Sequence, residues 1–273
     1  EGCKTLAIED FETCGLTGDF TQKYKQGEQN NFVNFLYHDG VTGKAGKNLG
    51  SRGVGKVVLL MASRARTKFA YTIREDDPDR SPLLVGKNLL RYRTTENGQG
   101  YGPKSYYLET WPKDAAREPV SDTAITTKFA EQFALSRQDE PGLSILIPYL
   151  EQSINAKNLR RAIIAEYHYA ILSGRLVVEL DNHGELETFN KDNLPETGEA
   201  DGDAMIRLAR WAVEHPEPEL ETLAPASGEL QKLTEELVPD AIRQAVNASL
   251  DQRKPIAIRL PLHVHPKKAV PQA

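Results

Sequence analysis

The chain has little cysteine, no long hydrophobic run and no excess of positive charge. Cys3 and Cys14 are the only cysteines among its 273 residues, and no Cys/His spacing typical of a metal site surrounds them, so we expect reduced thiols. No apolar run approaches the roughly 18 residues that a membrane span needs, and the N-terminus lacks the apolar segment of a signal peptide. These absences predict a cytoplasmic protein with no membrane partner.

The formal net charge of −5 and the pI near 5.8 argue against a dedicated nucleic-acid binder, although they leave room for a local basic patch. The usual catalytic constellations are missing as well. Ser63 follows an apolar run without the flanking glycines of a nucleophile elbow, and Cys14 has no nearby histidine. Neither a nucleic-acid partner nor covalent catalysis is therefore indicated.

With 39% hydrophobic residues, the 273-residue chain can fill two modest cores or one large one, and we expect two domains. The first domain is expected over residues 1–150 and ends with the apolar segment GLSILIPY. A second α/β domain is expected over residues 151–273. The chain enters its first apparent strand, KTLAIED, almost at once, so we expect that it begins in the middle of a fold and that the second domain is incomplete.

Hydrophobic periodicity predicts the elements of the first domain. We expect a strand over 4–8, a helix over 30–37, a buried helix from Val57, and an antiparallel pair formed by TKFAYTIRE and PLLVGKNLLRYR. The stretch ENGQGYGPKSYYLETWPKD predicts a loop or an extended insertion. Ser121 is the expected N-cap of a helix that runs to about Leu135, and GLSILIPY is expected to be the closing strand of the sheet.

The second domain is expected to alternate helices with short strands. The pattern predicts a helix over 154–172, a hairpin that turns at Asn182–Gly184 and a helix through Trp211. A further helix is expected near the end, with a break or kink at Pro239, followed by the strand KPIAIRLPLHVH.

The segment from Gly40 to Lys56, GVTGKAGKNLGSRGVGK, is rich in glycine and lysine. Glycines let successive backbone N–H groups converge on an anion, and lysines neutralise it, so the segment predicts a phosphate site. A Walker A loop would need a buried strand directly before it and a Ser or Thr after the lysine, but Val57 occupies that position. A P-loop kinase is accordingly only a third hypothesis.

Two further motifs flank this run. Asp10 and Gly15 lie in IEDFETCGL, where a strand ends in an acidic pair, and Gly142 opens the late strand in PGLSILIP. The order of the motifs along the chain resembles the Bergerat ATP-binding fold of the GHKL ATPase family. It runs from an acidic strand end through a mobile loop, a GxxGxG run, a helix and a hairpin to a Gly-led strand. That family includes histidine kinases, DNA gyrase B, heat-shock protein 90 and MutL.

The resemblance assigns roles to residues of the first domain. Asp10 matches the aspartate that receives the adenine amino group, and Gly15 matches a glycine of the same box. Glu12 stands where the family prefers another glycine, and Leu143 replaces the threonine that follows the third-box glycine, here Gly142.

The second glycine box corresponds to Gly50, Gly53 and Gly55, in the lid that folds over the triphosphate. Lys56 is close enough to this box to pair with a phosphate. No catalytic residue or metal ligand is assigned within the chain.

The resemblance implies an α/β architecture of the α+β two-layer sandwich type, with ATP as ligand and Mg²⁺ in the intact protein. Nucleotide would order the lid and switch an interface with a protein partner or a second copy, through a transducer-like second domain. More narrowly, the chain is similar to bacterial proteins described as histidine-kinase-like ATPases, some of them linked to genome defence. The family's magnesium-binding asparagine lies on a helix before the first box, so we expect this chain alone to be inactive.

The alternative is a non-catalytic scaffold that keeps a degenerate ATPase fold. Glu12, Leu143 and the expected lack of the magnesium helix favour it. Aromatic residues such as Tyr101 could stack on nucleic-acid bases, but packing is the simpler interpretation without a basic stripe.

Overall fold

The computed structural model describes residues 3–21, 30–37, 55–109, 118–198, 200–216, 220–221 and 240–259. The chain divides into two compact units, Glu1–Ile154 and Asn155–Ala273. In the ranges just given, no helix is long and apolar enough to cross a membrane.

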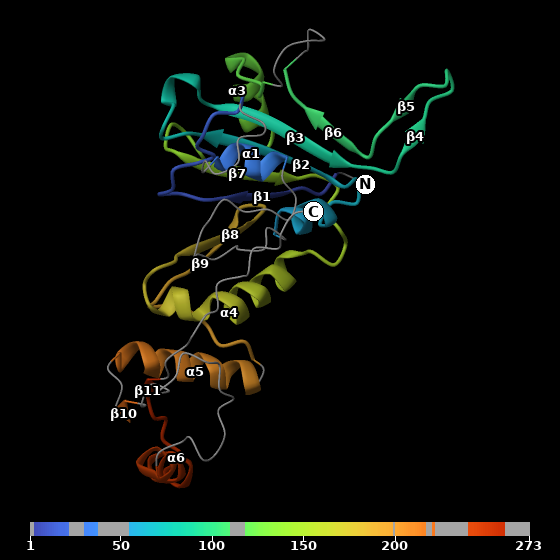
Figure 1. The fold of residues 1–273 in the computed structure, drawn as a ribbon. Coiled ribbons are helices and arrows are strands. Elements are labelled where there is room, and N and C mark those ends of the chain that lie inside the picture. Colours follow the sequence, from blue (N-terminus) through green and yellow to red (C-terminus); the bar gives the residue numbers. More distant parts are fainter. Residues whose placement is uncertain are drawn as a thin grey trace, which may run out of the picture. The chain divides into compact units, whose positions relative to one another are not determined.

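Unit 1 is built on a five-stranded sheet with the order β1-β7-β2-β3-β6, in which all neighbouring strands are antiparallel (Figure 1). The strands are β1 (Leu6–Glu9), β7 (Gly142–Ile147), β2 (Thr67–Ile73), β3 (Leu83–Leu89) and β6 (Lys104–Tyr107). Together with the helices packed on it, this sheet confirms the expected α+β class. The late apolar strand β7 is not the closing strand at an edge but lies between β1 and β2.

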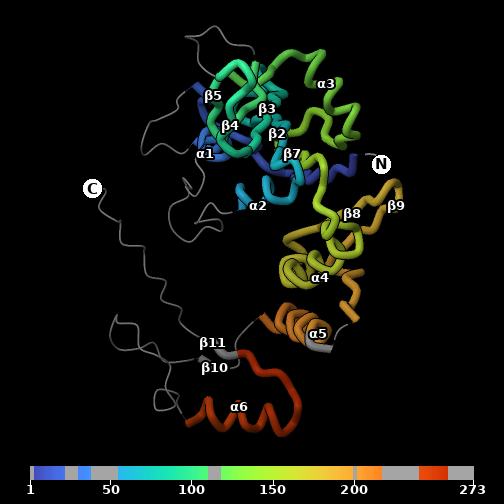
Figure 2. Tube along the Cα trace, turned by 90° about the vertical axis from the view of Figure 1, so that its right-hand side faces the viewer, coloured from blue at the N-terminus to red at the C-terminus, as the bar shows by residue number. Residues whose placement is uncertain are grey.

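The two faces of the sheet bury different side chains, because successive residues of a strand point to opposite sides. On one face, Ala70, Leu83 and Val85 pack in a cluster with the helix α1 (Asn31–Leu36). On the other face, Tyr71 and Leu84 belong to a cluster that includes aromatic residues of the helix α3 (Thr123–Gln132). Figure 2 shows the strands between these two helices.

Local hydrogen bonds fix where the helices begin. The side chain of Asn30 caps α1 by accepting from the Val33 N–H at 2.9 Å. In α3 the cap is Asp122, which accepts from the Ile125 N–H at 3.0 Å, and not Ser121 as the sequence suggested. The N-cap is the residue directly before the first helical residue, Thr123, and Ser121 stands one position too early for this role. The helix expected near Val57 is α2 (Gly55–Met61), and a 3-10 turn, η1 (Pro78–Arg80), joins β2 to β3.

The stretch expected to be a loop or an extended insertion contains two strands, β5 (Gly100–Tyr101) and β6, and a third, β4 (Arg93–Thr94), lies just before it. β4 and β5 form a hairpin that projects from the sheet (Figure 1), and β6 pairs with β3 at the sheet edge. β6 docks because Gly86 on β3 has no side chain: a Cβ there would lie 2.8 Å from the Tyr107 Cβ. Tyr107 instead contacts Phe69 across the glycine, with ring centroids 5.9 Å apart.

Unit 2 contains α4 (Ala156–Leu172), β8 (Val178–Asn182), β9 (Glu185–Phe189), α5 (Ala200–Glu214), β10 (Leu220–Glu221), α6 (Asp240–Gln252) and β11 (Ile258–Arg259). Its core joins α4, β9 and α5 through residues such as Ile164, Phe189 and Ile206. The predicted hairpin is confirmed, since β8 and β9 pair around His183 and Gly184, both with positive φ. The break expected at Pro239 lies outside the described residues.

Candidate functional site

At one end of the sheet the structure brings together two of the glycine motifs singled out in the sequence. We call this group the strand-end cluster and define it as Glu9, Asp10, Gly15, Thr72, Arg137 and Gly142–Ser144. Its members come from β1, β2, β7 and the segments that follow β1 and α3. The fold thus makes neighbours of Asp10, Gly15 and Gly142, although Asp10 and Gly142 are more than 120 residues apart in the sequence.

Asp10 follows β1 directly, with its side chain 49% exposed. Its Oδ1 atom accepts hydrogen bonds from the Leu143 N–H at 2.6 Å and the Thr13 hydroxyl at 2.9 Å, and lies 3.5 Å from Arg137 Nη2. In the part of the chain that the structure describes, the second oxygen, Oδ2, accepts no hydrogen bond. One carboxylate oxygen therefore fixes the side chain, while the other is available to a donor from outside.

Arg137 is the buried centre of the cluster. Its guanidinium donates to Ser144 Oγ at 3.0 Å, to the backbone carbonyl of Pro141 at 3.0 Å and to the backbone carbonyl of Asp10. The Glu9 carboxylate accepts from the Arg137 N–H at 3.3 Å and from Ser144 Oγ at 2.7 Å. A buried cation is tolerated only when it is paired and hydrogen-bonded, so these contacts also lock the ends of β1 and β7 together.

Tyr71 borders this cluster on β2. Burial raises the pKa of its phenol, while the Arg137 guanidinium acts in the opposite direction. The hydroxyl therefore stays protonated at neutral pH.

Gly15 is required by space and by backbone conformation. Its φ is +70°, and a Cβ would lie 2.2 Å from the Ile73 carbonyl oxygen and 2.8 Å from Thr72 Oγ1. Thr72, which is fully buried, accepts from the Leu16 N–H at 3.0 Å and donates to the Gly142 carbonyl at 2.9 Å. The loop after β1 is thereby held against β2 and β7.

Sequence reasoning missed Thr72 and Arg137. A hydroxyl in the otherwise apolar end of β2 was the only signal for Thr72, and nothing local marks Arg137. The sequence did mark Glu12 as a place for glycine, and the structure gives this residue a φ of +58°, a conformation that glycine adopts most easily.

Of the remaining predicted residues, Gly55 and Lys56 lie in α2. Gly55 is the first residue of α2, and no atom of the described residues lies within 4 Å of a Cβ built on it. Lys56 Nζ donates to the Asn34 carbonyl of α1 at 2.6 Å, and the buried Lys87 donates to the Leu36 carbonyl at 2.9 Å. Lysines thus bind the carbonyl end of α1 in this structure.

Gly50 and Gly53, the other two glycines of the second box, lie outside the described residues. The contact of this box with phosphate stays a prediction.

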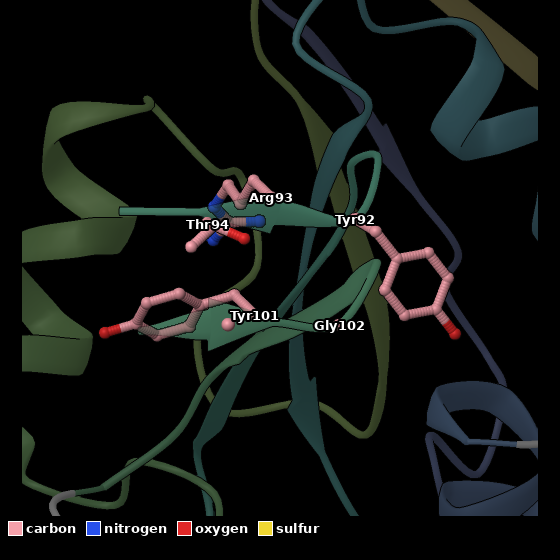
Figure 3. A pocket seen from close by; sticks show the side chains of 6 residues that line it. Tyr92, Arg93, Thr94, Tyr101 and Gly102 are labelled. Atoms are coloured by element: carbon pink, nitrogen blue, oxygen red, sulfur yellow. The ribbon is translucent and has the colours of Figure 1, made fainter. Parts of the chain in front are cut away.

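A pocket of about 360 Å³ lies on the β4–β5 hairpin and not at the strand-end cluster. Its lining residues are Tyr92, Arg93, Thr94, Gly100, Tyr101 and Gly102 (Figure 3). Within the described ranges, no three His, Cys, Asp or Glu side chains gather closely enough to hold a metal ion.

Comparison of the chain with protein-family models, with curated proteins and with solved structures finds no match. The function must therefore be argued from the residues and their geometry.

Proposed function

We propose that unit 1 is the ATP-binding module of a Bergerat-type ATPase, in which nucleotide orders the glycine-rich segment 40–56 and switches an interface with a partner. The observation that carries the proposal is the Asp10 carboxylate. Its Oδ1 is fixed by the Leu143 N–H, and its Oδ2 is open on a side chain that is about half exposed. A fixed acceptor of this kind suits the exocyclic amino group of adenine.

The glycine-rich segment supplies the phosphate side of the proposed site. Glycine backbone closes on a triphosphate without side-chain bulk, and Lys56 adds a positive charge. To reach a phosphate, Lys56 exchanges its hydrogen bond with the Asn34 carbonyl for a stronger, charge-assisted one. Because the Asn34 carbonyl belongs to α1, losing this hydrogen bond couples nucleotide binding to the packing of α1 on the sheet.

In this proposal, nucleotide binding orders the glycine-rich lid, and the ordered lid is what a partner recognises. A ligand shifts an equilibrium by its differential affinity for two states, and here it favours the state with a closed lid. The closed lid then presents a surface to a protein partner or to a second copy of the chain. Mg²⁺ belongs to the intact protein in this proposal, and no step uses a metal bound by the described residues.

The substitution Asp10→Asn tests the adenine assignment sharply. Asparagine keeps a carbonyl oxygen for the Leu143 N–H but replaces Oδ2 by an NH₂ group, which meets the adenine amino group donor to donor. We expect ATP affinity to fall by roughly a hundredfold, measured by isothermal titration calorimetry, with little change in thermal unfolding.

Asp181→Asn is the matched control. Asp181 Oδ1 likewise accepts a backbone N–H, from Gly184 at 2.6 Å, and lies in unit 2. This variant is expected to bind ATP like the wild type. Unchanged ATP affinity in Asp10→Asn would sink the adenine assignment.

A non-catalytic scaffold is the second candidate, and the Arg137–Asp10 contact favours it. A carboxylate that receives a backbone N–H, a hydroxyl and a neighbouring guanidinium already has a structural role. Thermal unfolding of the intact protein with and without a non-hydrolysable ATP analogue, each with and without Mg²⁺, separates the two candidates. A rise in the midpoint supports the ATPase, and no rise under any of these conditions supports the scaffold.

A further inference from the structure

The β4–β5 hairpin is an arm that has no packing partner in the sheet core. We define the arm as residues 90–102, all of which are exposed, and Figure 1 shows it extending beyond β3 and β6. It is held by its own hydrogen bonds, such as Thr95 N–H to the Gln99 carbonyl at 2.9 Å. Such a segment contributes little to the core of unit 1, so its side chains call for another explanation.

The arm carries aromatic rings beside arginines. Tyr92 is 81% exposed, more than any other large apolar side chain in the described chain. Tyr101 is 46% exposed, and the guanidinium of its cross-strand partner Arg93 lies 5.3 Å from its ring centroid. In Figure 3 the two tyrosine rings point in different directions, with Arg93 above Tyr101. Each ring therefore offers a face to a ligand.

Two glycines keep the surface between the rings flat. Gly100 and Gly102 have no positive φ, and among the described residues no atom lies within 4 Å of a Cβ built on either. The fold thus requires glycine at neither position, unlike Gly15 in the strand-end cluster. The two glycines line the pocket together with Tyr92, Arg93 and Tyr101, and because they add no side chain they leave room there for a planar ligand.

The charge of the arm is opposite to that of the whole chain. The arm contains two basic residues, Arg91 and Arg93, and one acidic residue, Glu96, so the arm is net positive while the chain has a net charge of −5. Leu90 is the only aliphatic side chain in the arm, so tyrosines and arginines supply most of its contact surface, and interfaces with proteins and with nucleic acids both use these residue types. Positive charge and exposed rings favour a ligand with phosphates and flat bases.

We infer that the arm binds single-stranded nucleic acid, with bases stacked on Tyr92 and Tyr101 and phosphates paired with Arg91 and Arg93. Single strands fit better than duplexes because only unpaired bases expose their faces for stacking. This inference stands independently of ATP binding, because none of its residues belongs to the strand-end cluster.

The test is fluorescence anisotropy of the whole chain with a labelled single-stranded oligonucleotide of roughly 12 nucleotides, a length within the range of known single-strand sites. We expect binding that weakens with salt, and weaker binding to a duplex of the same length. Tyr92→Ala and Tyr101→Ala should each lower affinity by roughly tenfold. Arg93→Ala should reduce the slope of log affinity against log salt by about 0.7, the value for one phosphate of a single strand.

Tyr169→Ala is the matched control. Tyr169 on α4 is 49% exposed and has Arg175 at 5.6 Å from its ring, so it repeats the Tyr–Arg chemistry away from the arm. It should bind the oligonucleotide like the wild type. Gly100→Val adds bulk to the flat surface between the rings without a clash in the fold and should also weaken binding.

Three outcomes would overturn the inference: no oligonucleotide binding by the wild type at low salt, unchanged binding by both tyrosine variants, or an equal loss in Tyr169→Ala. A protein captured by the arm in place of the oligonucleotide would assign it to a different class of partner.

Discussion

The strand-end cluster and the arm use the same residue types for opposite purposes. Gly15 in the cluster is fixed by a φ of +70° and by close backbone contact, whereas Gly100 in the arm meets nothing within 4 Å. The arginines differ in the same way: Arg137 is buried among carbonyls and carboxylates, and Arg93 lies on an exposed ring. Glycine and arginine thus stabilise the fold in one region and leave a surface open to ligands in the other.

The largest expected effect on stability comes from Gly15→Ala in the cluster, with Gly100→Ala in the arm as its comparison. Gly15→Ala places a Cβ 2.2 Å from the Ile73 carbonyl oxygen in a left-handed conformation, so the free energy of unfolding should fall by roughly 2–5 kcal/mol. Gly100→Ala should change it by no more than about 0.5 kcal/mol. Urea denaturation of both variants measures the difference, and equal effects would erase the contrast between the regions.

A smaller effect is expected when the buried Arg74 loses the charge of its partner, Asp77. Arg74 has a side chain only 2% exposed and pairs with Asp77 at 2.6 Å, so Asp77→Asn should cost about 2–3 kcal/mol at neutral pH. Glu96→Gln in the arm changes the same kind of charge at an exposed site and should have almost no effect.

This second prediction also has a pH dependence. The hydrogen bond from Arg80, with that from Arg74, lowers the pKa of Asp77 in the folded protein. The stabilisation is therefore complete above the ordinary carboxylate value of about 3.9 and is lost as pH falls through the lower folded pKa. Urea denaturation at several pH values should show the stability difference between wild type and Asp77→Asn shrinking below about pH 4. A difference that stayed constant down to pH 2 would contradict the assignment.

The smallest effect is expected at Glu12, where the chain lacks the glycine that its φ of +58° favours. Glu12→Gly should raise the midpoint of thermal unfolding slightly, by the equivalent of up to about 1 kcal/mol. Glu12→Ala removes the same charge but keeps a Cβ, so it should bring no gain. If both variants stabilise the protein equally, charge and not backbone conformation is the cause.

Much of the local structure could be predicted from the sequence because the signals are local. The strand character of TKFAYTI, the helix that starts near Asn30 and the turn at His183-Gly184 each depend on neighbours within a few residues. The same holds for Asp10 and Gly15 as a strand end and its turn. At the start of α3 the sequence pointed to Ser121, and only the hydrogen bond showed that Asp122 is the cap.

The sequence by itself determined the α+β pattern of elements and marked the strand end at Asp10 as a candidate site. Only the tertiary structure placed β6 beside β3, buried Arg137 against residues 127 and more positions away, and exposed Tyr92 on an arm. The physical reason is separation along the chain. Propensity and periodicity act over one or two turns, whereas the partners of a buried charge and the exposure of a ring depend on which distant segments meet.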